Sequence, residues 1–553
     1  MHTNCFFNPC HDQFPVLMIL HCDSTKFLHN HIFIHSTRDI SNTPFIRYKE
    51  FNLLYADSQE WCRECVTIFP LKELLNGLDY KIKGDLKDFT INRFIDHSKQ
   101  IDEGDVFVSE TDNRVFIEEA IQNGAKTILT EYFIPDCSVP QVILPTDMDL
   151  LKERISSMTY KLYGKQIKTI GITGTNGKTT VASFIGQLLM QQQKSVCVIG
   201  TLGVFINGQK LERPFRSNTT LPFYDFLQVV NYCYEHHVEY IVLEASSQGL
   251  LDNRLGMYPI DLGVFLNIGK DHLEFHGGMV PYKKSKELLA TLSKQIVIND
   301  DDEWCRSIAE KTDLPVIRFG EQYTNDVIYQ KADYSTEIVH YKYIVRDKEV
   351  QLKMKNSGYY NGMNIAAAIA SLSALNIPFG EIKALTLPKG RLEQIQNSKG
   401  VEVLIDYAHT PDALEACLST VTSYAKKDIY VVFGCGGNRD KQKRKGMGEV
   451  ATKYATKAII TSDNPRNERP EDIIAEIVSG VDLKKVMIEP DRKKAIILAL
   501  RSAQKGDVIL IAGKGHEQEQ IANGLVVPFS DHQVVHDYLE ELGGLITKND
   551  PVA

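Results

Sequence analysis

The chain carries no surplus of positive charge. Its 553 residues include 62 Lys and Arg against 71 Asp and Glu, which gives a formal net charge of −9. A protein that covers nucleic acid needs a basic surface to neutralise the phosphates. The composition therefore excludes nucleic acid as the expected partner.

Long apolar runs and internal repeats are also missing. The longest apolar run in the first part of the chain, Phe14 to Leu20, has seven residues, whereas a membrane-spanning helix needs about 20. Gly (36) and Pro (20) are near their average frequencies, and no short repeat runs through the chain, so collagen-like, coiled-coil and disordered classes are excluded. We expect a globular protein of three or four domains without a membrane segment.

Cysteines are sparse over most of the chain, because five of the eleven fall within the first 70 residues. Cys62-x-x-Cys65, which follows several histidines, could hold zinc, but no second pair stands at finger-like spacing. We interpret residues 1–70 as an irregular N-terminal extension without the features of a secretory signal. The few unpaired cysteines of the remaining chain suit a reducing cytoplasm, where we expect the protein to act.

From Leu71 onward, short apolar strands alternate with amphipathic helices, which predicts α/β domains with parallel sheets. A small α/β domain is expected over 71–163, with a helix at Val115 to Asn123. A central doubly wound domain over 164–388 and a Rossmann-like domain over 389–553 complete the predicted chain. The expected strands are 94–95, 106–108, 127–129, 142–144, 169–172, 240–243, 262–266, 295–298, 403–405, 429–433, 458–461, 486–488 and 508–512.

The sharpest local motif is GITGTNGKTT at 171–180, which joins an apolar strand to an amphipathic helix. Gly174 and Gly177 let the backbone approach phosphate oxygens closely, Lys178 suits the β and γ phosphates, and Thr179 suits Mg²⁺. Ile172 stands where the general phosphate-loop pattern has glycine. The alternative is a simple Gly/Thr turn, but the strand, loop and helix context favours nucleotide binding.

Three further sequence features are each weak evidence for a catalytic site when taken alone. Glu244 ends an apolar strand, where it could hold the metal bound to Thr179; Asp271-His-Leu-Glu-Phe-His276 follows the strand that ends at Asn267; and Lys286 closes the run Tyr282-Lys-Lys-Ser-Lys. A strand-end glutamate is often solvated, and a lysine run is usually a wet helix face.

Together with other motifs, these residues resemble the Mur ligases, ATP-dependent amino-acid-adding enzymes of peptidoglycan synthesis. The resemblance is greatest to the members that extend UDP-N-acetylmuramoyl-L-alanyl-D-glutamate, usually with meso-diaminopimelate or L-lysine. It runs from about Leu71 to the C-terminus. The motifs that carry it are TGTNGKTT (173–180), EASSQGLLDNR (244–254), DHLEFHGGMVPYKKSK (271–286), GYYNGMN (358–364), GRLE (390–393), DYAHTPDALE (406–415), FGCGGNRDKQKR (433–444), DNPR (463–466) and GKGHE (513–517).

The resemblance implies a reaction in which ATP phosphorylates a carboxylate and an amine then attacks the acyl phosphate. Two Mg²⁺ ions are expected, one on Thr179 and Glu244, the other on His272 and Lys286, and the family's matching lysine is commonly carbamylated. Lys178, Glu244, His272 and Lys286 are the implied catalytic residues. The implied ATP-binding residues are Gly174, Thr175, Asn176, Gly177, Lys178, Thr179 and Thr180 around the phosphates, Asn361 and Asn364 at adenine, and Arg391 and Asp406 at phosphate and ribose.

The two other substrates are implied in the same way. Ser98, Thr219, Thr220, Ser246 and Arg254 are the implied contacts of the UDP-muramoyl dipeptide. Diaminopimelate-using relatives carry DNPR, whose arginine can pair with the distal carboxylate that lysine lacks. The implied diaminopimelate contacts are Arg439, Asp463, Asn464, Arg466, Gly513 and Glu517.

The N-terminal domain departs from the family. Asp96-His97-Ser98-Lys99 stands in place of the Asp-Ser-Arg element that receives uridine, and Glu110 to Arg114 runs into the next helix without the usual Gly-rich stretch. Gln248 stands where many relatives have histidine. A ligase of the same chemistry with another acyl substrate or amino acid, such as a folate-type enzyme, and a non-catalytic nucleotide-binding paralogue are the alternatives. We expect a monomer that acts on small molecules.

Overall fold

The computed structural model describes residues 69–86, 90–91, 93–212, 215–216, 219–271, 273–330, 332–335, 338–355, 357–378 and 382–541. The predicted extension, apart from Phe69 and Pro70, lies outside this part of the chain, and so do the Cys62–Cys65 pair and His272. In the part of the chain that the structure describes, no helix is long and apolar enough to cross a membrane.

The N-terminal region forms a five-stranded sheet with the order β2-β7-β6-β5-β4, in which β2 alone pairs antiparallel. Helix α2 begins after Asn113, whose side chain accepts a hydrogen bond from the Val115 amide and so caps the helix. The elements are β1 (Phe69–Pro70), α1 (Leu71–Leu75), β2 (Lys81–Lys83), β3 (Thr90–Ile91), β4 (Phe94–Ile95), β5 (Val106–Ser109), α2 (Arg114–Gln122), β6 (Thr127–Thr130), β7 (Gln141–Ile143) and α3 (Met148–Leu162).

The central region forms an eleven-stranded sheet with the order β11-β10-β9-β12-β8-β13-β14-β15-β16-β17-β18. The strands from β9 to β16 in this order run parallel, as predicted, and antiparallel pairs extend the sheet at both edges. The strands are β8 (Lys168–Thr173), β9 (Val196–Gly200), β10 (Gly203–Ile206), β11 (Gln209–Lys210), β12 (Tyr240–Glu244), β13 (Leu262–Phe265), β14 (Ile296–Asn299), β15 (Val316–Gly320), β16 (Val327–Gln330), β17 (Ile338–Val345) and β18 (Lys348–Lys355).

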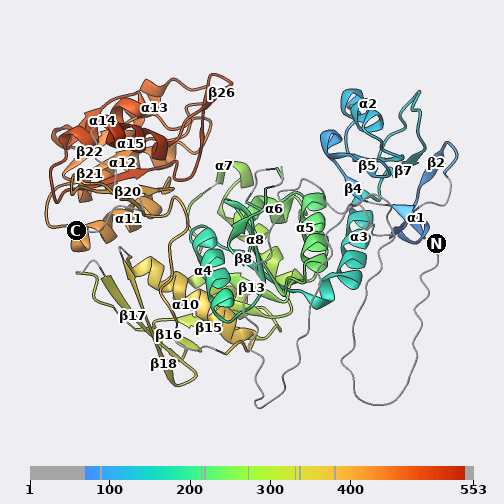
Figure 1. Ribbon diagram of the computed structural model, residues 1–553, viewed down its shortest axis with the longest axis horizontal. Coiled ribbons are helices and arrows are strands. Elements are labelled where there is room, and N and C mark those ends of the chain that lie inside the picture. The colour runs from blue at the N-terminus through green and yellow to red at the C-terminus, as the bar shows by residue number, and fades with distance from the viewer. Residues whose placement is uncertain are drawn as a thin grey trace, which may run out of the picture. The chain divides into compact units, whose positions relative to one another are not determined.

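Helices α4 and α10 pack against each other over this sheet (Figure 1). Nearly all side chains of α10 are buried, which explains its run of alanines. The helices of the region are α4 (Lys178–Gln191), α5 (Phe223–Glu235), α6 (Ser247–Leu251), α7 (Leu273–His276), α8 (Met279–Leu292), α9 (Glu303–Ala309) and α10 (Tyr359–Ala374).

The C-terminal region has a six-stranded sheet with the order β19-β20-β24-β21-β22-β23, parallel except for β19. Its strands are β19 (Glu393–Ile395), β20 (Glu402–Asp406), β21 (Ile429–Phe433), β22 (Lys457–Ile460), β23 (Val486–Ile488) and β24 (Val508–Ala512). A separate hairpin pairs β25 (Glu519–Ala522) with β26 (Leu525–Pro528). The helices are α11 (Pro411–Tyr424), α12 (Gln442–Tyr454), α13 (Pro470–Ile477), α14 (Arg492–Ser502) and α15 (Asp531–Glu541).

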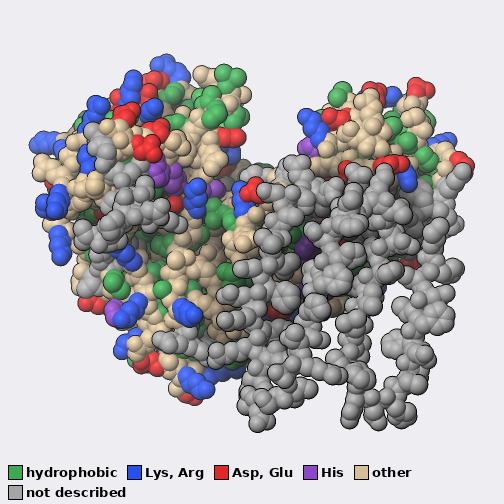
Figure 2. Space-filling view, viewed as in Figure 1, with side chains coloured by type: hydrophobic (Ala, Val, Ile, Leu, Met, Phe, Trp, Pro, Cys, Tyr) green, Lys and Arg blue, Asp and Glu red, His purple; other side chains and the backbone are tan. Residues whose placement is uncertain are grey.

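The hairpin exposes an apolar strand. Leu525, Val526 and Val527 are 68%, 56% and 42% exposed, and Figure 2 shows hydrophobic side chains at this edge of the C-terminal region. The backbone of Arg466 is hydrogen-bonded to the same hairpin, through its amide to the Ile521 carbonyl and through its carbonyl to the Asn523 amide. The hairpin therefore fixes the position of a predicted site residue.

Candidate active site

The phosphate loop lies at the carboxyl end of β8, between β12 and β13, where the strand order reverses. Ligands of doubly wound sheets bind at this kind of position. Gly174 and Gly177 have φ angles of +154° and +91°. A Cβ atom on Gly177 would lie 2.6 Å from Asn364 Oδ1, so both the conformation and the space require glycine here.

Two lysines converge on one carbonyl of this loop. Lys178 Nζ donates to Gly174 O at 2.9 Å, and Lys286 Nζ, from α8, donates to the same oxygen at 2.8 Å. Burial lowers the pKa of Lys178, and burial together with the charge of Lys178 lowers the pKa of Lys286 well below its usual value. The two amines therefore lie close together at the loop, where the charge on one disfavours the charge on the other.

Lys286 is the more deeply buried of the two, with 1% of its surface exposed. Its Nζ lies 4.7 Å from the centre of the Tyr282 ring, and the Tyr282 hydroxyl lies 3.1 Å from Thr175 Oγ1. Within the described residues, no carboxylate forms an ion pair with Lys286. A buried amine without such a partner favours its neutral form.

Glu244 ends β12 beside β8 and reaches the start of α4. Thr179 Oγ1 donates to Glu244 Oε2 at 2.9 Å, and the Thr201 amide donates to Glu244 Oε1 at 3.0 Å. Burial raises the pKa of Glu244, and the positive charge of Lys178 opposes this effect. A threonine hydroxyl beside a carboxylate is the oxygen donor set that Mg²⁺ prefers, so these residues fit the predicted ion.

No cluster of three His, Cys, Asp or Glu side chains suited to a metal occurs among the residues that the structure describes. The predicted second ion depends on His272, which lies outside them, and on Lys286. A carbamate formed on Lys286 would supply the oxygen ligands that an unmodified lysine lacks.

The loop opens into a cavity of about 430 Å³ that both the central and the C-terminal regions line. Asn361 and Asn364, on the first turns of α10, line it with Phe319 and Tyr359. Asn361 is 1% exposed, and its Nδ2 group has no hydrogen-bond partner among the described residues. A buried donor without a partner is costly, so this amide suits an acceptor atom of a nucleotide base.

Arg391 and Asp406 close the cavity from the C-terminal region. Arg391 Nη2 donates to Thr179 Oγ1 at 3.3 Å and lies over the ring of Tyr407, 4.8 Å from its centre. Asp406 accepts from the Leu392 and Ala408 amides, both at 2.7 Å. Because both Asp406 oxygens bind backbone, this side chain fixes the loop that carries Arg391.

The residues implied for the acyl substrate lie next to Glu244. Thr220 Oγ1 donates to the Glu244 carbonyl at 2.8 Å and lies 3.0 Å from Ser246 Oγ. Arg254 Nη1 donates to the Thr220 carbonyl at 3.0 Å, and Thr219 Oγ1 lies 3.1 Å from Thr201 Oγ1. The structure thus brings four of the five predicted residues together.

Ser98, the fifth, lies in the N-terminal region, where its hydroxyl donates to Glu119 at 2.5 Å. It is buried, and the hydroxyl already has a partner within its own region. The neighbouring Asp96 accepts from Arg216 of the central region at 2.6 Å, and Arg216 also bonds Asp225. Ser98 stays a prediction as a uridine contact.

The predicted amino-acid site lies at the carboxyl ends of the C-terminal strands. Arg466 has φ +53°, and its Nη1 donates to the Gly437 and Asn464 carbonyls at 2.9 and 3.3 Å. Burial and the nearby charge of Arg439 lower the pKa of Arg466. Among the described residues, the Arg466 guanidinium donates only to backbone carbonyls. Together with the neighbouring guanidinium of Arg439, it forms a site for a carboxylate.

Asp463, Asn464, Gly513 and Glu517 surround the same point. Gly513 has φ +111°, and a Cβ atom there would lie 2.8 Å from Asp463 Oδ2. Asn464 Nδ2 donates to Glu517 Oε2 at 3.1 Å. The six residues predicted for diaminopimelate lie on three loops, which follow β21, β22 and β24.

Tyr407 and Thr201 were missed in the sequence. Burial and the charges of Glu517, Asp463 and Asp271 raise the pKa of Tyr407 to about 12, and the charge of Arg391 opposes this effect. Tyr407 lines the cavity, and its ring lies 5.4 Å from that of His516 in the loop after β24, so it adjoins both sites. Thr201 follows β9, and only the strand order places it beside Glu244.

Family models match two parts of the chain: the Mur ligase middle domain at residues 172–372, and the Mur ligase, glutamate ligase domain at 390–515. Together with the site geometry and the relatives below, these matches show that the chain belongs to the Mur ligase family.

Among its relatives is the UDP-N-acetylmuramoyl-L-alanyl-D-glutamate--2,6-diaminopimelate ligase of Caldanaerobacter subterraneus, 36% identical over 85% of this chain and 99% of the relative. A solved structure of a ligase with the same name is 28% identical, covers 86% of this chain and 100% of its own, and has a TM-score of 0.57. The MurF ligase from Thermotoga maritima in complex with ADP shares the fold, with 20% identity, a TM-score of 0.60, and coverage of 82% and 98%.

Proposed function

We propose that this protein is an ATP-dependent, ADP-forming ligase that adds meso-diaminopimelate to UDP-N-acetylmuramoyl-L-alanyl-D-glutamate in peptidoglycan synthesis. One observation carries the proposal. The Tyr407 ring lines the cavity of the phosphate loop, with Arg391 over it, and lies 5.4 Å from the ring of His516, which belongs to the loop that carries Gly513 and Glu517 of the carboxylate site. The relatives named above act on these substrates by name.

In the first step, an oxygen of the substrate carboxylate takes the γ-phosphoryl group of ATP, and ADP leaves. Lys178 and the loop amides orient the phosphates, while Arg391 reaches the same point from the other side of the cavity. Thr179 and Glu244 would hold Mg²⁺, which neutralises charge on the transferring oxygens.

Lys286 has a separate role in the proposal. Its lowered pKa leaves a fraction of the amine neutral, and a neutral amine can add CO₂ with loss of a proton to give a carbamate. The product carries negative charge beside Lys178, because both side chains reach the Gly174 carbonyl. This change replaces a repulsion between two lysines by an attraction.

In the second step, the amine of the acceptor attacks the acyl carbon, phosphate leaves, and the nitrogen loses a proton. Arg466 and Arg439 bind the distal carboxylate of diaminopimelate, and Glu517 accepts from its distal ammonium group. A lysine acceptor lacks this carboxylate and leaves Arg466 unpaired, which disfavours it.

We propose the cytoplasm as the location of this reaction, because it uses ATP and a nucleotide-linked substrate. The N-terminal region differs from the family in its uridine-binding elements, and this difference concerns only the choice of acyl substrate. The proposed catalytic residues Lys178, Glu244 and Lys286 belong to the central region.

The test is ADP release by the purified protein with ATP and UDP-muramoyl dipeptide, in parallel with meso-diaminopimelate, L-lysine, L-glutamate and no acceptor. We expect release that needs both the dipeptide and meso-diaminopimelate, with one amide formed per ADP. Equal ADP release without any acceptor, or no amide with any of them, would contradict the proposal. Amide formation with glutamate and a folate acid instead would identify the folate-type alternative.

A further inference from the structure

A lysine of the GKGHE motif is fully buried at the amino-acid site. Lys514 has 0% of its surface exposed. Its Nζ donates to Glu517 Oε2 at 2.9 Å and to Asn464 Oδ1 at 3.1 Å. Burying an ammonium group is costly unless its partners compensate it, so these two contacts define what Lys514 does.

The amide of Asn464 completes the network. Its Nδ2 group donates to Glu517 Oε2 at 3.1 Å, and its Oδ1 atom also accepts from the Ile521 amide at 3.0 Å. Glu517 Oε2 therefore receives two donors, from Lys514 and Asn464. Its other oxygen, Oε1, accepts no hydrogen bond from the residues that the structure describes. The Glu517 side chain is 31% exposed, so a ligand can reach this oxygen.

Glu517 also acts on Arg466 through its charge, because it opposes the lowering of the Arg466 pKa. A mobile Glu517 could neutralise Arg466 and compete with the carboxylate of a substrate. The contacts with Lys514 and Asn464 hold Glu517 away from that role.

We propose that Lys514 is a positioning residue that sets acceptor specificity. By binding one oxygen of Glu517, it leaves the other to accept from an ammonium group next to the carboxylate that Arg466 binds. The site thus selects acceptors whose far end carries both groups. This inference depends on the proposed ligase function.

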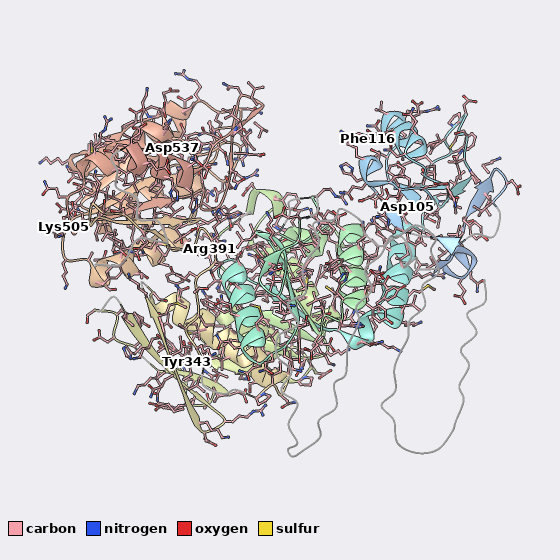
Figure 3. All side chains as sticks on the ribbon, viewed as in Figure 1. Asp105, Phe116, Tyr343, Arg391, Lys505 and Asp537 are labelled. Atoms are coloured by element: carbon pink, nitrogen blue, oxygen red, sulfur yellow. The ribbon has the colours of Figure 1, made fainter. Side chains whose placement is uncertain are left out.

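The test compares two acceptors: meso-diaminopimelate and 2-aminopimelate, which keeps the distal carboxylate but lacks the distal amine. In the unchanged protein, kcat/KM is expected to be at least about tenfold higher for diaminopimelate, the value of one hydrogen bond to a charged group. Lys514→Met should reduce that ratio about tenfold, mainly through KM for diaminopimelate. The control Lys505→Met, an exposed lysine of the same region (Figure 3), should leave the ratio unchanged.

A purely structural lysine would lower kcat/KM for both acceptors equally, and that result would overturn the inference. Glu517→Gln keeps the buried cation and provides a second test if Lys514→Met is unstable. It must also reduce the ratio, and in that background Lys514→Met must have no further effect on it. If the unchanged protein forms no amide with diaminopimelate, the proposed function fails; if it does and the ratio survives either variant, only this inference fails.

Discussion

At the scale of single residues, the backbone holds the side chains of the amino-acid site in place. Arg466 adopts a left-handed conformation with φ +53° and is bonded through its amide and its carbonyl to the β25–β26 hairpin. Most residues adopt this conformation at a cost, while asparagine and glycine adopt it readily.

Arg466→Asn should therefore keep the loop intact and remove only the guanidinium group. We expect kcat/KM for meso-diaminopimelate to fall about hundredfold, because a charged pair in a partly desolvated site is lost. KM for ATP should not change. Steady-state kinetics with the control Arg469→Ala, whose side chain is 76% exposed, would check this. Unchanged turnover by Arg466→Asn would remove the assignment of the acceptor.

The sequence motifs predicted much of this site, and their limits have physical causes. Thr179, Glu244, Lys178 and Lys286 meet as the motifs imply, because strand ends of a parallel sheet share one edge. The burial of Lys514 could not be predicted, since it depends on Asn464, which comes from the loop after β22. Tyr407 was not predicted either, because nothing in its immediate sequence shows that two sites adjoin it.

At the scale of elements, the phosphate loop depends on the space around its glycines. Gly177 has φ +91°, and Asn364 of α10 occupies the place where a Cβ atom would go. The loop and the first turn of α10 are therefore packed as one unit.

Gly177→Ala should raise KM for ATP about tenfold, from backbone strain of about 1–2 kcal/mol together with displacement of Asn364. Gly524→Ala is the matched control, since Gly524 has φ +75° with nothing within 4 Å of a Cβ atom. It should cost stability without any change in KM. Nucleotide titration and thermal unfolding of both variants measure the two effects; equal KM values would contradict the packing argument.

Helices α12 and α13 are joined by an ion-pair network. Arg444 of α12 is 1% exposed and donates to Glu468 and Glu476 at 2.9 and 2.8 Å. Glu468 also accepts from the Asn438 amide at 2.6 Å, and these contacts, led by the hydrogen bonds from Arg444, lower the pKa of Glu468 to about 2.

Glu468→Gln should lower the free energy of unfolding by about 2 kcal/mol at pH 7. Because the folded pKa lies below the ordinary glutamate value of 4.5, the stabilisation is complete above that value and is lost as the pH falls towards about 2. Urea unfolding of both proteins at pH 7 and pH 3.5 should show the difference shrinking at the lower pH. The control is Glu471→Gln, with a 60% exposed side chain. A difference that does not vary with pH would contradict the role of the Glu468 charge.

Most predicted strands are confirmed within one residue, because continuous apolar runs mark strands buried on both faces. The edges of the central sheet were not predicted. Strand β17 alternates exposed and buried residues, so it lacks the continuous apolar run of the parallel strands. Sequence periodicity also does not specify strand order, which decides that β12 adjoins β8.

At the scale of the whole molecule, the central and C-terminal regions complete one cavity. Arg391 connects them through Thr179, and Ser423 Oγ donates to the Tyr334 carbonyl at 3.0 Å. A reactive acyl phosphate between the regions is protected from water by such closure.

Arg391→Met should lower amide formation about hundredfold, as expected for the loss of one donor to a developing charge. The share of ADP released without amide should rise, because water then reaches the intermediate. Parallel measurement of ADP and amide checks both effects, with the exposed Arg501→Met as a control. If the ratio of amide to ADP stays at one, the closure argument is wrong.

Tyr407 lines the nucleotide cavity with Arg391 over its ring, and the same ring lies against His516 of the acceptor site. If either ligand displaces this ring, the affinity of the other site changes as well, and thermodynamic reciprocity requires the same factor in both directions. Small molecules designed for the acceptor pocket should therefore be screened with nucleotide present, since their affinity for the empty protein is measured with a different position of the Tyr407 ring.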